Sequence, residues 1–363
     1  MNTQRSRTPA SNPIVLDGSE GEGGGQILRT GLALSLLTQR PLQIERIRAK
    51  RPKPGLMRQH LTCVKAAMAV SGGQAQGAEI GSTQLHFVPG ASLQAGEHHF
   101  HIPGAGSSLL VLQTVLPALM LADAPSTLVL EGGTHNPLAP PFEAVAYSYA
   151  PLLRRLGIGL DLQLQRRGFM PAGGGSVEVR LTPSSTLVPF DVCERGALQA
   201  MWAEVVAPHL KQDIPVRELH TLSDCLGWPK EIGPDKALRL MDGKADPGPG
   251  NALTAVLAYE HVTEVFQELD SQRRSAETVA RRVAQQVAHY QRSSGALGEH
   301  LADQWMLPLA VAVWRSGQAA RYTCTHLSTH TRTQAHTIAQ GLPVHIEFAS
   351  LGSGCTHVHI TPA

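Results

Sequence analysis

A glycine-rich stretch near the start of the chain carries the residue types of an anion-binding loop. It reads GSEGEGGGQILRT over residues 18–30 and runs into an apolar helical segment from Ile27 to Leu37. Free backbone N–H groups at the start of a helix bind anions, so the stretch resembles a phosphate loop. It lacks the Gly-Lys-Ser/Thr ending of such loops, and Glu20 and Glu22 would repel phosphate. A polyphosphate bound here would need cations from another part of the chain.

A basic run offers such cations. Residues 46–58 read RIRAKRPKPGLMR and contain six basic side chains with no acid among them. The net charge of the whole chain is only +2, so any contact with a polyanion must be local. Aromatic residues make up 4% of the chain, which argues against a long stacking platform for single strands. Recognition of a terminus or short segment stays open, and the alternative is a solvated surface run.

His326 is a candidate nucleophile. It lies in the stretch CTHLSTHT, after a short predicted strand, where a neutral imidazole can attack phosphorus. The chain has 17 histidines, however, and a single one is usually an ordinary surface or core residue. His326 and His330 are four residues apart, which would suit zinc on a helix, although the surrounding Thr and Ser favour a strand or loop. Histidines in alternating patterns predict strand faces instead: His98, His99, His101, His357 and His359.

The composition is that of a globular protein. Hydrophobic residues make up 42% of the 363 residues and charged residues 17%, enough for two domains or one large domain with an insert. No segment approaches the roughly 18 uninterrupted apolar residues of a membrane span, and the polar N-terminus shows no secretion signal. Five scattered cysteines without a CxxC pair favour reduced thiols. The sequence therefore predicts a cytoplasmic protein without a membrane partner.

Two helical segments resemble each other and predict an internal repeat. Gly106–Leu121 and Gly298–Val313 share the spacing of Leu, Gln and Leu-Pro, and each precedes a strand-like stretch. Gly23–Leu37 begins a third, weaker copy. A polar loop, a second helix and alternating strand-like tails follow in each copy, although ordinary amphipathic patterning is the alternative. Around a pseudo-threefold axis the equivalent loops would converge, and they carry Arg48, Arg51, the triplet His135-Asn136-Pro137, and His326.

An additional segment separates the second and third copies. Residues 188–294 contain a long charged helix, SAETVARRVAQQVAHYQR, and the turn-rich stretch MDGKADPGPGN. The segment predicts a smaller inserted α/β domain, with residues 1–187 and 295–363 forming the large domain.

Two loop motifs favour structural roles. Gly173–Gly175 precede a strand rather than a helix, so they are no Rossmann fingerprint and predict a tight bend with close backbone packing. Gly132–Phe142, read as GGTHNPLAPPF, follows a strand and predicts a rigid loop. Its prolines could pack against a flat ring, and a plain turn is the equal alternative.

Taken together, the motifs resemble the RNA 3'-terminal phosphate cyclase family. Six of them fall in family order: LDGSEGEGGGQILRT, RAKRPKPGLMRQHL, LVLQTVLPAL, GGTHNPLAPPF, GEHLADQ and THLSTHT. The most specific element is a further stretch, RGFMPAGGGSV, which looks like the family signature. The resemblance runs through nearly the whole chain. It implies an α+β fold, in which a large domain of three repeated two-helix/four-stranded-sheet units holds a smaller inserted α/β domain.

The resemblance also implies a reaction. A histidine attacks the α-phosphorus of ATP and forms a covalent histidine–AMP adduct. AMP then passes to an RNA 3'-phosphate, the 2'-OH attacks, and a 2',3'-cyclic phosphate forms as AMP leaves. On this basis the substrates are ATP and RNA 3'-phosphate ends, and Mg²⁺ or Mn²⁺ assists.

Matched residue by residue, the resemblance assigns a site. His326 is the nucleophile and Glu22 the carboxylate for a divalent cation near the triphosphate, which would explain the acid in the glycine-rich loop. Arginines replace the missing lysine: Arg29, Arg48 and Arg51. Polar pocket residues are Gln26, Gln59, His60 and Gln113. Pro140, Phe266 and His300 surround adenine, and Asp303 and Gln304 contact the nucleotide beside them.

Two positions depart from the family pattern. His300 stands where the family often has tyrosine, and His330 stands where it usually has asparagine. Two other functions are alternatives for this sequence. A non-catalytic relative that acts as a ribosome-assembly factor would lack the nucleophilic histidine, and a zinc hydrolase using His326 and His330 would need a third ligand that the sequence does not offer.

Overall fold

The computed structural model describes residues 12–269, 274–352 and 354–363. Helices and mixed β-sheets alternate along the chain, which confirms the predicted α+β class. Most of the polar N-terminal stretch, from which no secretion signal was predicted, lies outside the described residues. None of the helices in the described ranges is both long enough and apolar enough to cross a bilayer.

The first sheet carries the glycine-rich loop and the basic run. Its strand order is β1 (Ile14–Asp17), β2 (Leu42–Glu45), β4 (Leu85–Val88) and β3 (Gln74–Gln76). β1 and β2 run parallel and the other pairs antiparallel. Two helices belong to this stretch of chain, α1 (Gln26–Thr38) and α2 (Arg58–Ser71). The glycine-rich loop joins β1 to α1, and the basic run joins β2 to α2.

The second sheet has the same order of parallel and antiparallel pairs. It consists of β5 (Gly96–His101), β6 (Ser126–Gly132), β8 (Gly175–Thr182) and β7 (Gly159–Arg166). α3 (Ser108–Leu119) joins β5 to β6. The predicted second helix is divided into α4 (Phe142–Ala144), a π-helical turn (Val145–Tyr149) and α5 (Ala150–Arg155). The bend before β8 is tight as predicted, because a Cβ on Gly173 would lie 2.0 Å from the carbonyl oxygen of Gly104.

The third sheet is built from the end of the chain. Its order is β13 (Ala320–Cys324), β15 (Cys355–Pro362) and β14 (Val344–Gly352), and its helices are α8 (Glu299–Ser316) and α9 (Thr329–Gly341). The other edge of β13 pairs with two separate residues. Val192 bridges to Tyr322 and Leu297 to Cys324, both in parallel.

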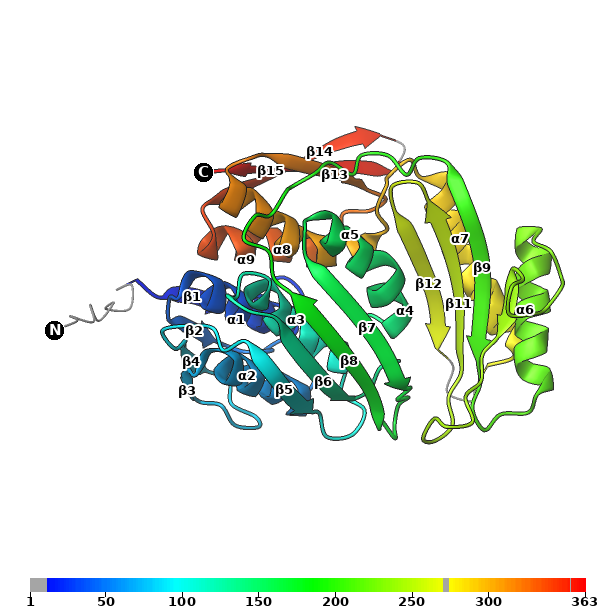
Figure 1. The fold of residues 1–363 in the computed structure, drawn as a ribbon, viewed down its shortest axis with the longest axis horizontal. Coiled ribbons are helices and arrows are strands. Elements are labelled where there is room, and N and C mark those ends of the chain that lie inside the picture. Colours follow the sequence, from blue (N-terminus) through cyan, green and yellow to red (C-terminus); the bar gives the residue numbers. More distant parts are fainter. Residues whose placement is uncertain (1–11, 270–273, 353) are drawn as a thin grey trace.

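The fourth sheet has a hydrophobic cluster of its own. It consists of β10 (Leu238–Leu240), β9 (Leu198–Val206), β11 (Ala252–Tyr259) and β12 (Thr263–Leu269), with α6 (Asp213–Leu226) and α7 (Ala276–Arg292). Leu219 of α6, Val283 of α7 and Leu253 of β11 are fully buried in this cluster. Figure 1 shows the fourth sheet at one end of the molecule, beside the second and third sheets.

The helices of the first three sheets meet in the interior, with the sheets outside them (Figure 1). α1 packs against both α3 and α9, and α3 also packs against α2 and α8. Apolar residues cover much of the surface of α1, from Ile27 to Leu36, and they are buried. This packing brings the N-terminal turns of α1, α8 and α9 close together, as the contacts below show.

Candidate functional site

The glycine-rich loop leads into a helix N-terminus that has no side-chain cap. Gly25 is the N-cap of α1, and the first turn of α1 contains no acidic residue. The first N–H groups of this helix therefore have no intrahelical acceptor and are available to an anion. The loop is pressed against α9, because a Cβ on Gly21 would lie 2.0 Å from Oγ1 of Thr333.

The glycines of the loop lie directly against cationic and polar side chains. A Cβ on Gly23 would lie 3.0 Å from Cβ of Lys50, and a Cβ on Gly24 would lie 3.0 Å from Nη2 of Arg51. A Cβ on Gly25 would come within 2.3 Å of Nε2 of His60. Any larger residue would fill the space between backbone and cations, which explains the three successive glycines.

Arg29 and His60 provide two donors beside Gly25. The structure records no hydrogen bond or ion pair for the Arg29 guanidinium within the described part of the chain, and desolvation lowers its pKa. His60 accepts the Met57 N–H at Nδ1 (3.2 Å), so its proton is on Nε2. Burial, reinforced by the charges of Arg29 and Arg48, lowers the pKa of His60 to about 3. His60 is therefore a neutral N–H donor.

Glu22 lies between an arginine of the basic run and a histidine of α9. Its Oε2 is 3.3 Å from Nη2 of Arg51 and 2.9 Å from Nε2 of His330. All three side chains are partly exposed. The acid in the glycine-rich loop is therefore balanced by partners from the basic run and from α9.

His330 and Gln26 extend this contact to α8. Nδ1 of His330 lies 2.9 Å from Oε1 of Gln26, and Nε2 of Gln26 donates to Oδ1 of Asp303 (2.6 Å). Because Gln26 donates to Asp303 through its amide nitrogen, its oxygen faces Nδ1 of His330. Burial raises the pKa of Asp303 to about 6, against the lowering effect of His330 and Arg29. The predicted residues Glu22, Gln26 and Asp303 are thus brought together.

His326 lies where the sequence predicted it, in the exposed loop between β13 and α9. Ser328 caps α9 by accepting the Thr331 N–H (3.1 Å), which fixes the end of this loop. His330 lies in the first turn of α9 and connects it to the glycine-rich loop. His330, where the resemblance led us to expect asparagine, therefore has a structural role.

Arg48 organises the basic run. Its backbone has a φ of +55°, and Nη1 donates to the carbonyl oxygens of Lys53 (2.7 Å) and Gly55 (2.9 Å). Within the described ranges only Nη1 is engaged, so the rest of the guanidinium is available to donate to an anion. Lys50, which sequence analysis did not select, donates to the Gly21 carbonyl (3.2 Å) and holds the same loop.

The predicted glutamines connect the interior helices. Oε1 of Gln59 accepts the Ser107 N–H (2.8 Å) at the start of α3, and Nε2 of Gln113 donates to Oε1 of Gln304 (2.8 Å) in α8. Among the predicted glutamines, Gln26 lies on α1 and Gln304 on α8. These two helices also carry the contact between Gln26 and Asp303.

The three residues expected around adenine occupy different surroundings. His300 is 89% exposed in the first turn of α8, and Pro140 lies partly buried in the loop after β6. Phe266 of β12 is buried and packs against Tyr290 with ring centroids 5.4 Å apart. The structure records no contact among these three residues, and their role stays a prediction.

The strand that carries Phe266 reaches α8 through a buried acid. Oε1 of Glu264 accepts the N–H of Gly298, the N-cap residue of α8 (2.5 Å). Burial raises the pKa of Glu264 to about 8. Sequence analysis missed this residue, because a lone Glu in a strand gives no signal of the helix end it meets.

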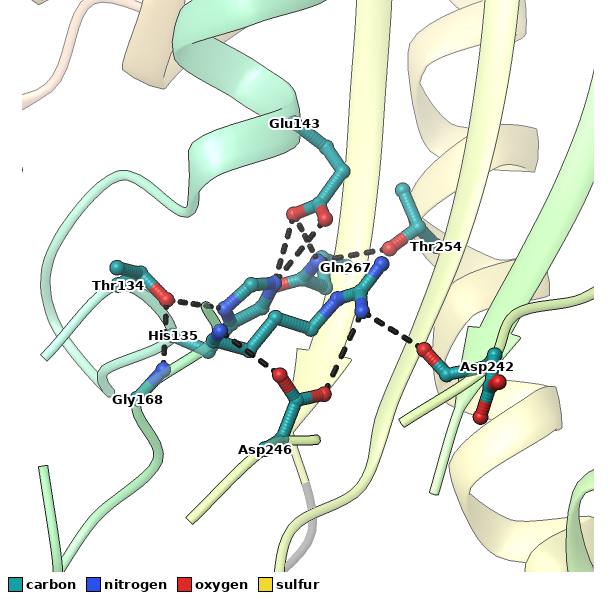
Figure 2. Close-up of polar contacts among 9 residues, drawn as sticks. Thr134, His135, Glu143, Gly168, Asp242, Asp246, Thr254 and Gln267 are labelled. Atoms are coloured by element: carbon teal, nitrogen blue, oxygen red, sulfur yellow. Dashed lines mark hydrogen bonds and ion pairs between the residues drawn. The ribbon is translucent and has the colours of Figure 1, made fainter. Parts of the chain in front are cut away.

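A second polar cluster is buried near the proline-rich loop (Figure 2). His135 lies between Oγ1 of Thr134 (2.8 Å from Nδ1) and Oε2 of Glu143 (2.9 Å from Nε2). Burial would raise the pKa of Glu143, but the charge and hydrogen bond of His135 outweigh burial and lower that pKa to about 2. Gln267 of β12 donates to Glu143 (3.1 Å) and to Thr254 (2.7 Å). His135 is only 1% exposed, and Gln267 ties the cluster to β12 and, through Thr254, to β11.

The site as a whole suits a polyphosphate. Around three glycines it combines an uncapped helix N-terminus, a neutral imidazole donor, Arg51, and the Arg29 guanidinium, which has no recorded partner among the described residues. Among the described residues, no group of three or more His, Cys, Asp or Glu side chains could hold a metal ion by itself. Glu22 stays the predicted carboxylate for a divalent cation, because Mg²⁺ is commonly held by one or two carboxylates together with substrate phosphates. His326 lies exposed in the loop before α9, and its role as the nucleophile stays a prediction.

Comparison with known proteins agrees with this chemistry. The family model described as RNA 3'-terminal phosphate cyclase matches residues 20–348. A protein of that name from Ralstonia nicotianae is 46% identical over 338 residues, which cover 92% of each chain. A protein of the same name from Koribacter versatilis is 45% identical, and the match covers 93% of this chain and 92% of that protein. One from Ectopseudomonas mendocina is 43% identical, with 92% of this chain and 94% of that protein covered. The chain therefore belongs to the RNA 3'-terminal phosphate cyclase family.

Proposed function

We propose that the chain is an ATP-dependent RNA 3'-terminal phosphate cyclase, which converts an RNA 3'-phosphate into a 2',3'-cyclic phosphate. The observation that carries the proposal is the contact series Arg51–Glu22–His330–Gln26–Asp303. It joins the glycine-rich loop, the basic run, α8 and the helix that follows His326. A polyphosphate bound at the start of α1 would then lie near the proposed nucleophile.

The proposed reaction has three steps. A ring nitrogen of His326 attacks the α-phosphorus of ATP, the bond to the bridging oxygen breaks, and pyrophosphate leaves. An oxygen of the RNA 3'-phosphate attacks the same phosphorus, the P–N bond breaks, and RNA(3')pp(5')A forms. The 2'-OH then attacks the 3'-phosphorus and gives up its proton as AMP leaves. Adenylylation is needed because a phosphate monoester dianion has no good leaving group until it is part of an anhydride.

The surrounding side chains have distinct parts in this scheme. Arg29, Arg48 and Arg51 would hold phosphate oxygens, for which guanidinium geometry is well suited. His60, neutral and protonated on Nε2, would donate one hydrogen bond without adding charge. Glu22 would hold Mg²⁺ or Mn²⁺, which would offset the charge of the triphosphate. Pro140, Phe266 and His300 would flank the adenine side.

The proposal includes the repeated architecture. The first two sheets share one strand order, in which a parallel pair is followed by two antiparallel pairs. In the third sheet, one edge of β13 forms parallel bridges with Val192 and Leu297, and the other edge pairs with β15. The third sheet differs from the predicted four-stranded unit, because it has three strands in the described part of the chain. Three units, the third with this smaller sheet, in residues 1–187 and 295–363, would hold an inserted domain of residues 188–294. The separate hydrophobic cluster of the fourth sheet supports the insertion. We further infer a cytoplasmic location, where its substrates ATP and RNA ends occur.

Labelling with ATP tests the proposal. The purified protein would be incubated with α-labelled ATP and Mg²⁺ or Mn²⁺, denatured, and treated with acid or base. A phosphoramidate gives a label that is stable to base and lost in acid. His326→Ala should abolish the label, whereas His345→Ala, which removes another exposed histidine of the third sheet, should keep it.

The same experiment separates the alternatives. A wild-type protein that never labels would favour a non-catalytic, RNA-binding relative. Labelling that survives in a folded His326→Ala protein would place the nucleophile at another histidine. Conversion of a 3'-phosphorylated RNA to a phosphatase-resistant end would complete the assignment.

A further inference from the structure

A surface groove between α2 and β5 borders the candidate site. It has a volume of about 320 Å³, and basic residues of both elements line it: Arg58, Lys65, His99 and His101. Ile80, which is 56% exposed, adds an apolar patch to its wall. Among the described residues that line it, none is acidic. The groove is therefore electropositive in its immediate lining.

The two strong cations of the groove are unpaired. Within the described part of the chain, the structure records no side-chain hydrogen bond or ion pair for Arg58 or Lys65. Arg46 and Arg51 of the same basic region, in contrast, pair with Asp17 and Glu22. A cation without an internal partner can neutralise a phosphate and release its counterion at little cost.

The groove starts at the site. Arg58 is the first residue of α2, and the next two residues, Gln59 and His60, face Ser107 and Gly25. Lys65 follows seven residues after Arg58, which is about 10 Å farther along the helix axis. That length corresponds to about three stacked nucleotides at 3.4 Å each. A strand that ends in the site would pass Arg58 first and Lys65 next.

An acid lies beside the two histidines that line the groove. Oε2 of Glu131 lies 3.1 Å from Nε2 of His99 and 3.4 Å from Nδ1 of His101. Glu131 lines a neighbouring cavity of about 230 Å³, which shares His101 with the groove. A carboxylate there disfavours a phosphate, so a polyanion would follow α2 rather than continue across β6.

We propose that this groove binds the RNA strand on the 5' side of its terminal phosphate. The inference rests on the proposed RNA substrate. Arg58 and Lys65 contact backbone phosphates, and Ile80 contacts sugar or base. Phe100 is only 7% exposed and offers no stacking face, so binding is independent of base sequence.

The test measures RNA affinity against salt. A labelled twelve-nucleotide RNA with a 3'-phosphate would be titrated by fluorescence anisotropy with wild-type protein and with Arg58→Gln/Lys65→Gln, at several salt concentrations. The control is Lys211→Gln/Arg281→Gln, which removes the same charge from exposed positions far along the chain. ATP-dependent labelling of each protein is measured in the absence of RNA.

Each outcome bears on a different claim. The groove variant should bind RNA about tenfold more weakly near 0.1 M salt, and the slope of log K against log salt should fall by about 1.4, or 0.7 for each lost phosphate contact. Its labelling by ATP should match that of the wild type. If the groove variant has the same RNA affinity and salt slope as the control variant, the groove does not bind RNA, and the enzyme assignment is unaffected. A wild-type protein that binds RNA but does not label would instead contradict the proposed function.

Discussion

Nε2 of His330 lies 2.9 Å from Oε2 of Glu22, and Nδ1 of the same ring lies 2.9 Å from Oε1 of Gln26. One imidazole thus holds both the carboxylate proposed to bind metal and the residue that begins α1. The contact joins parts of the chain more than 300 residues apart. It also fixes α9 at the end nearest His326.

Substitution of His330 should separate hydrogen bonding from other roles. His330→Asn should adenylylate within a few-fold of the wild type, because one amide can replace one of the two contacts. His330→Ala replaces neither. We expect it to be slowed about fivefold, a loss of about 1 kcal/mol for partly exposed contacts. Single-turnover labelling measures both, and an asparagine variant as slow as the alanine variant would show that the imidazole does more than hold Glu22 and Gln26.

Glu22→Ala should change the metal requirement. A carboxylate about 4 Å from a phosphate charge is repulsive by about 1 to 4 kcal/mol, depending on screening, so Glu22 is useful mainly through a cation. We expect slower adenylylation and a higher half-saturating Mg²⁺ or Mn²⁺ concentration, with RNA affinity little changed. Glu20→Ala, in the same loop, is the control. Faster labelling of Glu22→Ala at unchanged metal would contradict the role.

Arg48→Lys and Arg51→Lys should both impair catalysis. Lysine keeps the charge but loses the two-donor geometry, at a cost of about 1.5 to 3 kcal/mol for a charge-assisted contact, or about ten- to a hundredfold in rate. Arg48 also loses its two bonds to the carbonyls of residues 53 and 55. Single-turnover cyclisation at two salt concentrations measures the effect. Wild-type rates in both variants would return the basic run to an ordinary surface.

His60 should make the protein less stable in acid. Its pKa is about 3 in the folded chain and 6.5 when unperturbed, so between these values the unfolded chain binds more protons. The free energy of unfolding should fall by about 1.4 kcal/mol per pH unit below pH 6.5 from this residue alone. Urea unfolding of wild type and His60→Gln at pH 7 and pH 5 isolates the effect. The variant should lose less stability over this interval, by about 2 kcal/mol.

Glu264 should make the protein less stable as the pH rises. Its folded pKa of about 8 exceeds the ordinary value of 4.5, so the folded chain holds the additional proton between these values. Stability from this residue is complete below about pH 4.5 and is lost as pH rises through 8. Glu264→Gln keeps an acceptor for the Gly298 N–H without titrating. Its stability relative to the wild type should increase from pH 5 to pH 8, and a constant difference would argue against a protonated Glu264.

The sequence was most informative where a pattern is local. The apolar period predicted α1, α3 and α8, and the charged amphipathic repeat predicted α7. Ile14–Asp17 and Gln74–Gln76 are too short to show a period, and both were missed. α6 was also missed, although Leu219 and Leu222 lie on one buried face and could have revealed it. The π-helical turn arises inside a helix that was otherwise predicted.

Site prediction selected residue types but not their partners. Motif order selected Glu22, Gln26 and Asp303, but nothing in the sequence indicated that His330 would connect the first two. Such a contact depends on how α1 and α9 pack, which only the folded chain determines. Burial likewise decides that His60 is neutral and that His135 is structural, since both are ordinary histidines in the sequence.

The strand order β13–β15–β14 has a consequence for how the protein matures. β15 is the middle strand of its sheet, yet it is the last of the three to be synthesised. Until it inserts, β13 and β14 have no hydrogen-bonded neighbour in common, and the loop that carries His326 is attached to an incomplete sheet. A chain still under synthesis would therefore lack a positioned nucleophile, even with the first two sheets already folded. ATP chemistry at His326 would begin only after this final strand is in place.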